Sequence, residues 1–275
     1  MTERQAIPDW HPPSGPLGEL TAASARRALL SRARLALLER EAADALPAPG
    51  FAAALRGPQV RVIAELKRRS PSRGGLDDSL IAGDRARAYQ SGGAAALSVL
   101  TEPTRFGGSL ADLAEVRAAV ALPLLRKDFI TDEVQLFEAR VHGASAVLLI
   151  ARALAPAHLA ALAGEATACR LECLIEVRDE GELERALRVP GAVVGVNNRD
   201  LETLLIEPAV AARLLPLVPR DRLAVYESGV SGVEDVERAA AAGADAVLVG
   251  SLLSVAPDGA AAVRMLSAVP RQGRA

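Results

Sequence analysis

From Val60 onward the chain alternates short apolar runs with longer segments rich in Ala, Glu and Arg. Short apolar runs separated by helical patterns predict βα units and a parallel sheet. Eight runs are found, centred on Ile63, Leu97, Leu125, Leu148, Leu174, Gly195, Val225 and Leu248. Consecutive centres are 21 to 34 residues apart, which leaves room for one helix and two loops. Eight such units predict an α/β fold of the (β/α)8 TIM barrel type.

A doubly wound open sheet is the alternative arrangement of alternating strands and helices. Its dinucleotide-binding form carries a G-x-G-x-x-G motif after the first strand, and none follows the run around Ile63. The count of eight units also favours the closed barrel. We therefore expect a barrel whose strands begin at about residue 60.

The segment before the barrel predicts helices that follow an irregular tail. Residues 1–16 are polar and rich in proline, so we expect a disordered extension. Leu17–Leu46 is dominated by Ala, Leu, Arg and Glu, which favour a helix. A second, short helix is expected at about Gly50–Leu55, so that 17–275 forms one barrel domain with N-terminal helices. Trp10 is the only tryptophan, and its position stays open.

Charge and composition argue against several classes of protein. The formal net charge of −2 gives no indication of a nucleic-acid or membrane surface. No run approaches the roughly 18 apolar residues of a membrane span, and the N-terminus lacks the apolar segment of a signal peptide. Cys169 and Cys173 lack matching histidines for a zinc site, and as small buried side chains they fit a reducing cytoplasm. We expect a cytoplasmic protein without a metal.

Three helices have recognisable first residues. Ser109, Thr131 and Ser231 each precede an amphipathic segment, and small hydroxyl side chains are favoured N-caps. Gly243 follows the segment that begins after Ser231 and is expected to end that helix as a C-cap. These signals support the alternation of strands and helices but carry no chemistry.

Polar side chains gather where most of the apolar runs end. Ile63, Glu65 and Lys67 alternate along the first run, so they share one face of a strand. An ion pair and a catalytic acid–base pair both explain Glu65 and Lys67. Comparable residues at other strand ends are Arg126, Lys127 and Asp128, Glu176, Asn197 and Asn198, and Glu227. Because a buried unpaired ion costs several kcal/mol, their accumulation at the C-terminal end of a barrel indicates an active site.

Two further features suggest what such a site binds. Ser228 and Gly229 follow the seventh run, and Gly250 and Ser251 follow the eighth, where barrels often bind phosphate through backbone N–H groups. Tight turns alone would also explain these residues. Two of the four phenylalanines, Phe106 and Phe129, fall in loops at the same end. They can face a ring of the substrate or pack on the barrel rim.

The motifs together resemble the indole-3-glycerol phosphate synthase family of tryptophan biosynthesis. The matching segments are IAELKRRSPSRG, LLRKDFI, LIEV, VNNRDL, ESGV and VLVGS, in this order, within roughly Leu17 to Leu266. The resemblance implies closure of an indole ring from 1-(2-carboxyphenylamino)-1-deoxyribulose 5-phosphate, with release of CO2 and water. It also implies that no cofactor or metal is needed. The expected partner is a phosphorylated small molecule, with no nucleic acid or membrane, and the protein is expected to be a monomer or weak homodimer.

The resemblance also implies roles for individual residues. Lys127 matches the general acid that protonates the substrate ketone, and Glu176 matches the base of the later dehydration. Lys67 matches a substrate contact and candidate proton donor, while Glu65, Asn197 and Glu227 match residues that hold substrate hydroxyls or orient the lysines. The remaining matches are Arg199 at the anthranilate end, Ser70 in the first loop, Phe106 and Phe129 in an apolar wall, and Ser228, Gly229, Gly250 and Ser251 in a phosphate cradle.

Two other functions remain open from the sequence. A class I aldolase would use Lys127 or Lys67 to form a Schiff base with a sugar phosphate. A catalytically inactive, phosphate-binding barrel would serve as a regulatory partner, although the acid, base and phosphate positions are all filled here. The sequence does not settle which lysine donates which proton.

Overall fold

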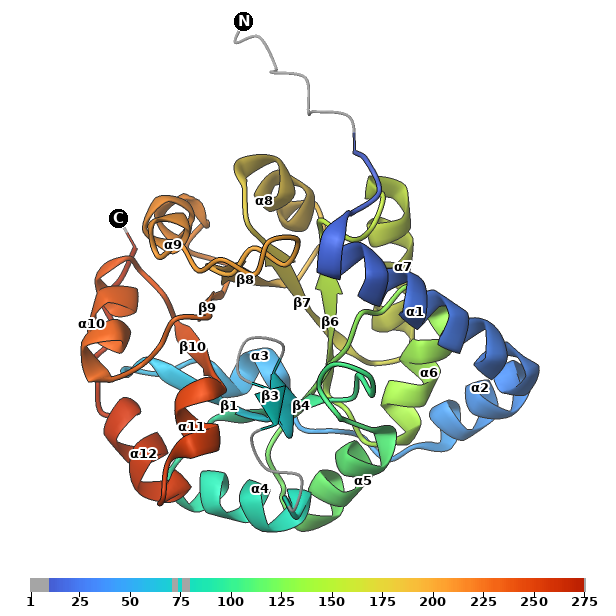
Figure 1. The fold of residues 1–275 in the computed structure, drawn as a ribbon, viewed down its shortest axis with the longest axis horizontal. Helices are drawn as coiled ribbons and strands as arrows, with labels where there is room; N and C mark the ends of the chain where they lie inside the picture. The colour runs from blue at the N-terminus through green and yellow to red at the C-terminus, as the bar shows by residue number, and fades with distance from the viewer. Residues whose placement is uncertain (1–9, 71–73, 76–79, 275) are drawn as a thin grey trace, which may run out of the picture.

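The predicted barrel is confirmed by the computed structural model, which describes residues 10–70, 74–75 and 80–274. Eight parallel strands close in the order β1-β10-β9-β8-β7-β6-β5-β4 (Figure 1). Because β1 pairs with both β4 and β10, the sheet has no open edge, and the doubly wound alternative is excluded. The barrel strands are β1 (Arg61–Leu66), β4 (Ala96–Leu100), β5 (Leu124–Lys127), β6 (Ala146–Ile150), β7 (Glu172–Val177), β8 (Val193–Asn197), β9 (Ala224–Glu227) and β10 (Ala246–Val249).

Eight helices, one after each strand, cover the outside of the barrel. They are α4 (Ala82–Ser91), α5 (Leu110–Ala119), α6 (Glu133–Val141), α7 (Pro156–Ala168), α8 (Glu180–Leu187), α9 (Ala209–Leu214), α10 (Val233–Ala241) and α12 (Gly259–Leu266). The short helix α11 (Ser251–Val255) precedes α12, and η2 (Leu215–Leu217) follows α9. Two short antiparallel strands, β2 (Arg69–Ser70) and β3 (Gly74–Gly75), lie in the loop after β1.

Alternate residues of each strand enter two separate apolar layers. Val62 and Ala64 of β1 pack with the outer helices, whereas Ile63 between them packs with Leu125 and Leu248 inside the barrel. This period of two is the geometry of a strand buried on both faces. It directs the next inward residue, Glu65, to the C-terminal mouth of the barrel.

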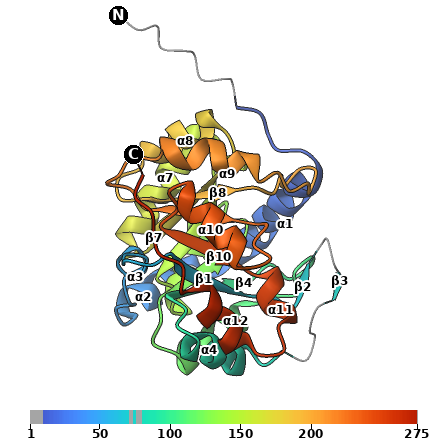
Figure 2. The same cartoon turned by 90° about the vertical axis from the view of Figure 1, so that its left-hand side faces the viewer.

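The N-terminal helices α1 (Gly15–Ser31), α2 (Leu35–Asp44) and α3 (Phe51–Ala54) cover the barrel from outside the βα repeat. Figure 2 shows α1 on the same side as the β2–β3 pair and α3 at the opposite end. The single helix expected over Leu17–Leu46 is instead interrupted by a 3-10 turn, η1 (Arg32–Arg34). The short helix expected at Gly50–Leu55 is confirmed as α3, whose first N–H groups donate to Glu172 at the start of β7.

Residues ahead of α1 contact the barrel through two side chains. The indole Nε1 of Trp10 donates to the carbonyl oxygen of Arg152, at 3.1 Å. Ser14 donates its backbone N–H and its hydroxyl to Glu202 Oε1, and Glu202 also pairs with Arg152. The sequence left the position of Trp10 open, and residues 1–9 of the expected extension lie outside the described residues.

The predicted helix starts are right in one case and shifted by one residue in two. Ser109 caps α5 by accepting the N–H of Asp112. At α6 the cap is Asp132 rather than Thr131. The carboxylate of Asp132 accepts a backbone N–H of the first turn, while the side chain of Gln135 accepts the N–H groups of Thr131 and Asp132. At α10 the N-cap position is Gly232 rather than Ser231. Gly243 has a φ of +92°, as expected after a helix. Among the described residues, no helix is long and apolar enough to cross a bilayer.

Candidate active site

A cavity of about 720 Å³ opens at the C-terminal ends of the strands. The predicted side chains and turns that line it come from seven of the eight barrel strands or from the loops that follow them. The predicted residues that line it are Glu65, Lys67, Phe106, Lys127, Phe129, Glu176, Asn197, Arg199, Glu227, Ser228, Gly229, Gly250 and Ser251. The side chain of the fourteenth, Ser70, lies outside the described residues.

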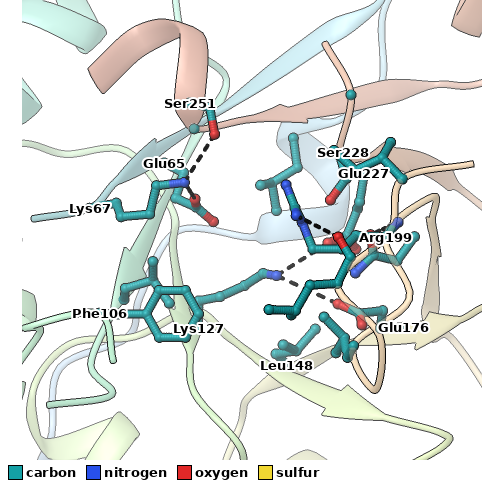
Figure 3. A pocket seen from close by; sticks show the side chains of 18 of the residues that line it. Glu65, Lys67, Phe106, Lys127, Leu148, Glu176, Arg199, Glu227, Ser228 and Ser251 are labelled. Atoms are coloured by element: carbon teal, nitrogen blue, oxygen red, sulfur yellow. Dashed lines mark hydrogen bonds and ion pairs between the residues drawn. The ribbon is translucent and has the colours of Figure 1, made fainter. Parts of the chain in front are cut away.

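Lys127 is held between two carboxylates inside this cavity. Its Nζ lies 3.3 Å from Glu227 Oε2 and 3.5 Å from Glu176 Oε2 (Figure 3). Burial alone lowers the pKa of Lys127, but the charges of Glu227, Glu176 and Glu65 outweigh burial and leave that pKa raised. The geometry therefore maintains an ammonium group in a largely apolar barrel.

Glu227 is the most enclosed carboxylate of the site, with 1% of its surface exposed. Burial raises its pKa, Lys127 opposes this effect, and Glu176 adds to it. The carboxylate lies directly over Gly195 of β8: a Cβ at that position would be 2.1 Å from Glu227 Oε1. The glycine thus makes the room that Glu227 needs to reach Lys127.

Lys67 lies in a separate polar group at the other side of the cavity (Figure 3). Its Nζ is 3.1 Å from Glu65 Oε1 and 3.4 Å from Ser251 Oγ. A Cβ on Gly250 would approach Glu65 Oε1 to 2.2 Å, so Gly250 makes room for this pair as well. The ion-pair reading of Glu65 and Lys67 is therefore correct, and both side chains also line the cavity.

Two asparagines organise the end of β8. Asn197 lines the cavity and accepts the backbone N–H of Arg199 with its Oδ1, at 2.9 Å. Arg199 in turn donates from Nη1 to the carbonyl oxygen of Leu204. Asn198 points the other way: its Nδ2 donates to the carbonyls of Glu227 and Ser228 and fixes the turn after β9. The sequence placed Asn198 at a strand end but gave it no role.

Phe106 and Phe129 form one apolar wall, with ring centroids 6.4 Å apart and a tilt of 34°. Glu102, which is fully buried, accepts the backbone N–H groups of Arg105 and Phe106 and so holds the loop that carries the first ring. Asp128 accepts the N–H of Phe129. The sequence indicates no function for either carboxylate, although both follow strands.

Arg27 of α1 connects the supports of the two rings. Its Nη2 is 3.0 Å from Asp128 Oδ1, and its Nη1 is 3.6 Å from Glu102 Oε1. Because both carboxylates are almost completely buried, an adjacent cation offsets part of their desolvation. The helix outside the βα repeat therefore contributes to the order of the aromatic wall.

The turn after β9 has an unusual backbone. Ser228 and Gly229 have φ angles of +66° and +89°, and both line the cavity. A left-handed non-glycine residue costs on the order of 1 kcal/mol, so surrounding contacts such as those from Asn198 must maintain it. Gly250 and Ser251 lie beside this turn at the end of β10. In the part of the chain that the structure describes, no group of three or more His, Cys, Asp or Glu residues is arranged to hold a metal ion.

Comparison with known proteins identifies the family. A family model described as indole-3-glycerol phosphate synthase matches residues 20–266, which is most of the chain. The chain belongs to the indole-3-glycerol phosphate synthase family. This confirms the resemblance stated from the motifs, and with it the assignment to an enzyme family of carboxy-lyases in tryptophan biosynthesis.

Curated relatives agree over most of their length. The chain is 54% identical over 233 residues to indole-3-glycerol phosphate synthase 2 of Streptomyces coelicolor, which covers 85% of this chain and 89% of the relative. It is 48% identical over 256 residues to the indole-3-glycerol phosphate synthase of a Nocardioides species, covering 88% and 97%.

Solved structures outside the indole-3-glycerol phosphate synthase family share the fold at low sequence identity. A 3-hexulose-6-phosphate synthase from Salmonella typhimurium matches with a TM-score of 0.60 and 16% identity, covering 76% of this chain and 97% of that one. A thiamine phosphate pyrophosphorylase from Pyrococcus furiosus matches with a TM-score of 0.56 and 14% identity, covering 77% and 95%. These likenesses concern the barrel alone.

Proposed function

We propose that the chain converts 1-(2-carboxyphenylamino)-1-deoxyribulose 5-phosphate into indole-3-glycerol phosphate, CO2 and water. The observation that carries the proposal is the position of Lys127. Its ammonium group lies between Glu176 and Glu227, in a cavity bounded by an aromatic wall and by the turn at Ser228. A general acid, a second ionisable group, an apolar surface and an anion-binding backbone are the requirements of this reaction.

Lys127 acts as the acid in the first step. The ring carbon attacks the ketone carbon, and the electron pair of the carbonyl bond moves to oxygen, which takes a proton from Nζ. A raised pKa keeps Lys127 charged before the step, and the two carboxylates direct the ammonium group. Phe106 and Phe129 supply an apolar face for the aromatic ring of the substrate.

The later steps use groups on both sides of the cavity. CO2 leaves with its bonding pair returning to the ring, which restores aromaticity. Glu176 then removes a proton as the hydroxyl leaves with a proton from a neighbouring ammonium group, for which Lys67 is the candidate. Asn197 and Glu65 orient substrate hydroxyls and Lys67, Arg199 lies at the anthranilate end, and the turns at Ser228–Gly229 and Gly250–Ser251 receive the phosphate. Ser70 belongs to the first loop in this scheme.

The charge state of Lys127 argues against a Schiff-base mechanism. An amine must be neutral to attack a carbonyl, and aldolase lysines are therefore kept in surroundings that lower their pKa. Three nearby carboxylates raise the pKa of Lys127 instead. Borohydride treatment in the presence of substrate should consequently leave no covalent adduct.

The proposal is tested by supplying the carboxyphenylamino substrate and following the fluorescence of the indole product. Product formation is expected with no added metal or cofactor. Glu176→Gln should retain the fold and lose about 10²–10⁴-fold in kcat, the range for one acid–base group. A purified wild-type protein that makes no indole-3-glycerol phosphate would contradict the proposed function.

A further inference from the structure

A second, smaller cavity of about 150 Å³ borders the active site. It meets the main cavity at residues that line both, namely Ile150, Glu176, Asn197, Arg199 and Leu201. Its remaining walls are largely ionisable and come from α1, β7, α8 and the loops after β6, β7 and β8: Leu17, Arg152, Val177, Arg178, Asp179, Glu182, Asp200 and Glu202. A polar space of this size holds about five water molecules at the density of liquid water.

Glu182 is the buried carboxylate of this second cavity, with 3% of its surface exposed. Its Oε2 accepts the backbone N–H of Arg178 at 2.7 Å, and Arg185 approaches Oε1 only to 4.0 Å. Burial, together with the charge of Asp179, raises the pKa of Glu182 to about 7. The carboxyl group is therefore able to gain and lose a proton near neutral pH.

A role in helix capping does not by itself explain a glutamate here. Glu182 occupies the third position of α8, where its own N–H donates to the N-cap Asp179 and its carboxylate accepts an N–H just before the helix. Gln135 fills the same position in α6 with an uncharged amide. The cap thus requires an acceptor, which an uncharged amide can supply, so capping alone does not require an ionisable group at this position.

The proposed reaction requires a proton from solvent in every turnover. A substrate with an ionised carboxylate carries three negative charges when its phosphate is doubly ionised, and the product carries two. Atoms and charge balance only when the substrate and one H⁺ give indole-3-glycerol phosphate, CO2 and water. Solvent reaches Lys127 through the main cavity, and the bound substrate fills that cavity during the reaction.

We propose that the second cavity is the proton entrance of the active site, in which water and the Glu182 carboxyl pass protons from solvent to Glu176. After ring closure this proton passes from Glu176 Oε2 to Lys127 Nζ, 3.5 Å away, so that Glu176 is again ionised when it acts as the base of the dehydration. The proton that Glu176 then removes and the proton that Lys67 donates cancel once the product has left, so that one H⁺ enters through the second cavity in each turnover. No covalent bond other than O–H and N–H is made or broken on this route. The inference rests on the proposed acid–base roles of Lys127 and Glu176, and it makes Glu182 a relay that does not touch substrate.

The test variant is Glu182→Gln, which retains the acceptor for the Arg178 N–H and removes the titratable group. Its kcat should fall at least about threefold, less than the hundredfold expected for removing the base itself, because cavity water still conducts. KM should not change. In weakly buffered solution with an indicator dye, proton uptake by the variant should lag behind that of the wild type. Added imidazole should raise the turnover rate of the variant but not that of the wild type.

A matched control is Glu172→Gln, which changes a glutamate of β7 at the opposite end of the barrel. Glu172 also accepts backbone N–H groups at a helix start, those of Phe51 and Ala52, but lines neither cavity. It should show wild-type kcat at every imidazole concentration. A second probe, Leu17→Phe, narrows the second cavity without altering Glu182 and should also lower kcat.

The outcomes separate this inference from the proposed function. A wild-type protein that forms no indole product removes the function itself. If the wild type turns over, and either Glu182→Gln or a folded Leu17→Phe matches it in kcat and in proton uptake, the proposal of a proton entrance is wrong while the proposed function stands. Thermal midpoints identify a variant that has lost its fold, in which case the other variant decides.

Discussion

A single methyl group added at Gly195 is expected to disable the site without changing any ionisable residue. The Cβ of Gly195→Ala would lie 2.1 Å from Glu227 Oε1 and 3.3 Å from Leu174 Cδ1. Oε1 must retreat by at least about 1 Å to reach an ordinary contact distance. Glu227 is enclosed by the barrel, so this movement separates its other oxygen from Lys127 Nζ, now 3.3 Å away.

The expected loss of stability follows from the weakened ion pair and from the reduced entropy of the unfolded chain. Removing one partner of a buried ion pair costs about 3–5 kcal/mol, because the remaining charge is left without compensation. Glu176 still pairs with Lys127, which places the cost near the lower limit. Replacing glycine by alanine at a compatible backbone angle returns about 0.4–1 kcal/mol from the unfolded chain. We expect a net loss of about 2–3 kcal/mol in the free energy of unfolding and about 100-fold in kcat, the usual effect of a 1 Å displacement.

Urea denaturation and a double-mutant cycle check the mechanism. In a Glu227→Ala background the clash partner is absent, so adding Gly195→Ala should no longer destabilise the protein and should return the gain of about 0.4–1 kcal/mol. Gly164→Ala is the control, since its Cβ meets nothing within 4 Å and the helix α7 should gain stability. The reasoning is refuted if Gly195→Ala costs as much without the Glu227 carboxylate as with it.

Three further changes test separate parts of the site. Lys127→Ala should abolish turnover in a protein that still folds, although its thermal midpoint should fall because Glu176 and Glu227 lose their cation; an unchanged kcat would remove the role of Lys127 as acid. Because the pKa of Glu182 is raised in the folded protein, the wild type should lose stability as pH rises from 4.5 through about 7. In urea titrations Glu182→Gln should therefore be more stable than the wild type at pH 8, by up to about 3 kcal/mol, and equal to it below pH 4.5. Arg27→Gln removes the cation beside Glu102 and Asp128, so KM should rise several-fold; an unaltered KM would show that the aromatic wall does not depend on α1.

The barrel and the location of its cavity were predictable because both follow from local periodicity. Residues two apart on a strand share a face, so Ile63 in the core directs Glu65 to the mouth. The spacing of the apolar runs determines the number of units. Lys127, Glu176 and Glu227 were therefore recognisable as facing one space, although they are separated by up to 100 residues.

The ion pairs of the site and the space that glycines leave for its side chains were not predictable, because both depend on distances between strands. The apolar run around Gly195 predicts a strand but gives no reason for a glycine there; the function of Gly195 appears only when β9 brings Glu227 across it. The helix starts at Asp132 and Gly232 were missed for a related reason. Thr131 and Ser231 are also good caps by type, and the choice among adjacent polar residues depends on which carboxylate or amide reaches the free N–H groups.

The excess of carboxylates around Lys127 is understandable if the lysine must be recharged. One carboxylate would suffice to orient the ammonium group, yet Glu176 and Glu227 together leave the cluster with one more negative than positive charge. The carboxylates raise the pKa of Lys127, and burial together with the charge of Glu176 raises the pKa of Glu227, so both groups attract a proton. After Lys127 has donated, an incoming proton is drawn to the cluster, and Glu176 is its member on the second cavity. The carboxylates that keep Lys127 protonated before the reaction therefore also favour its reprotonation afterwards.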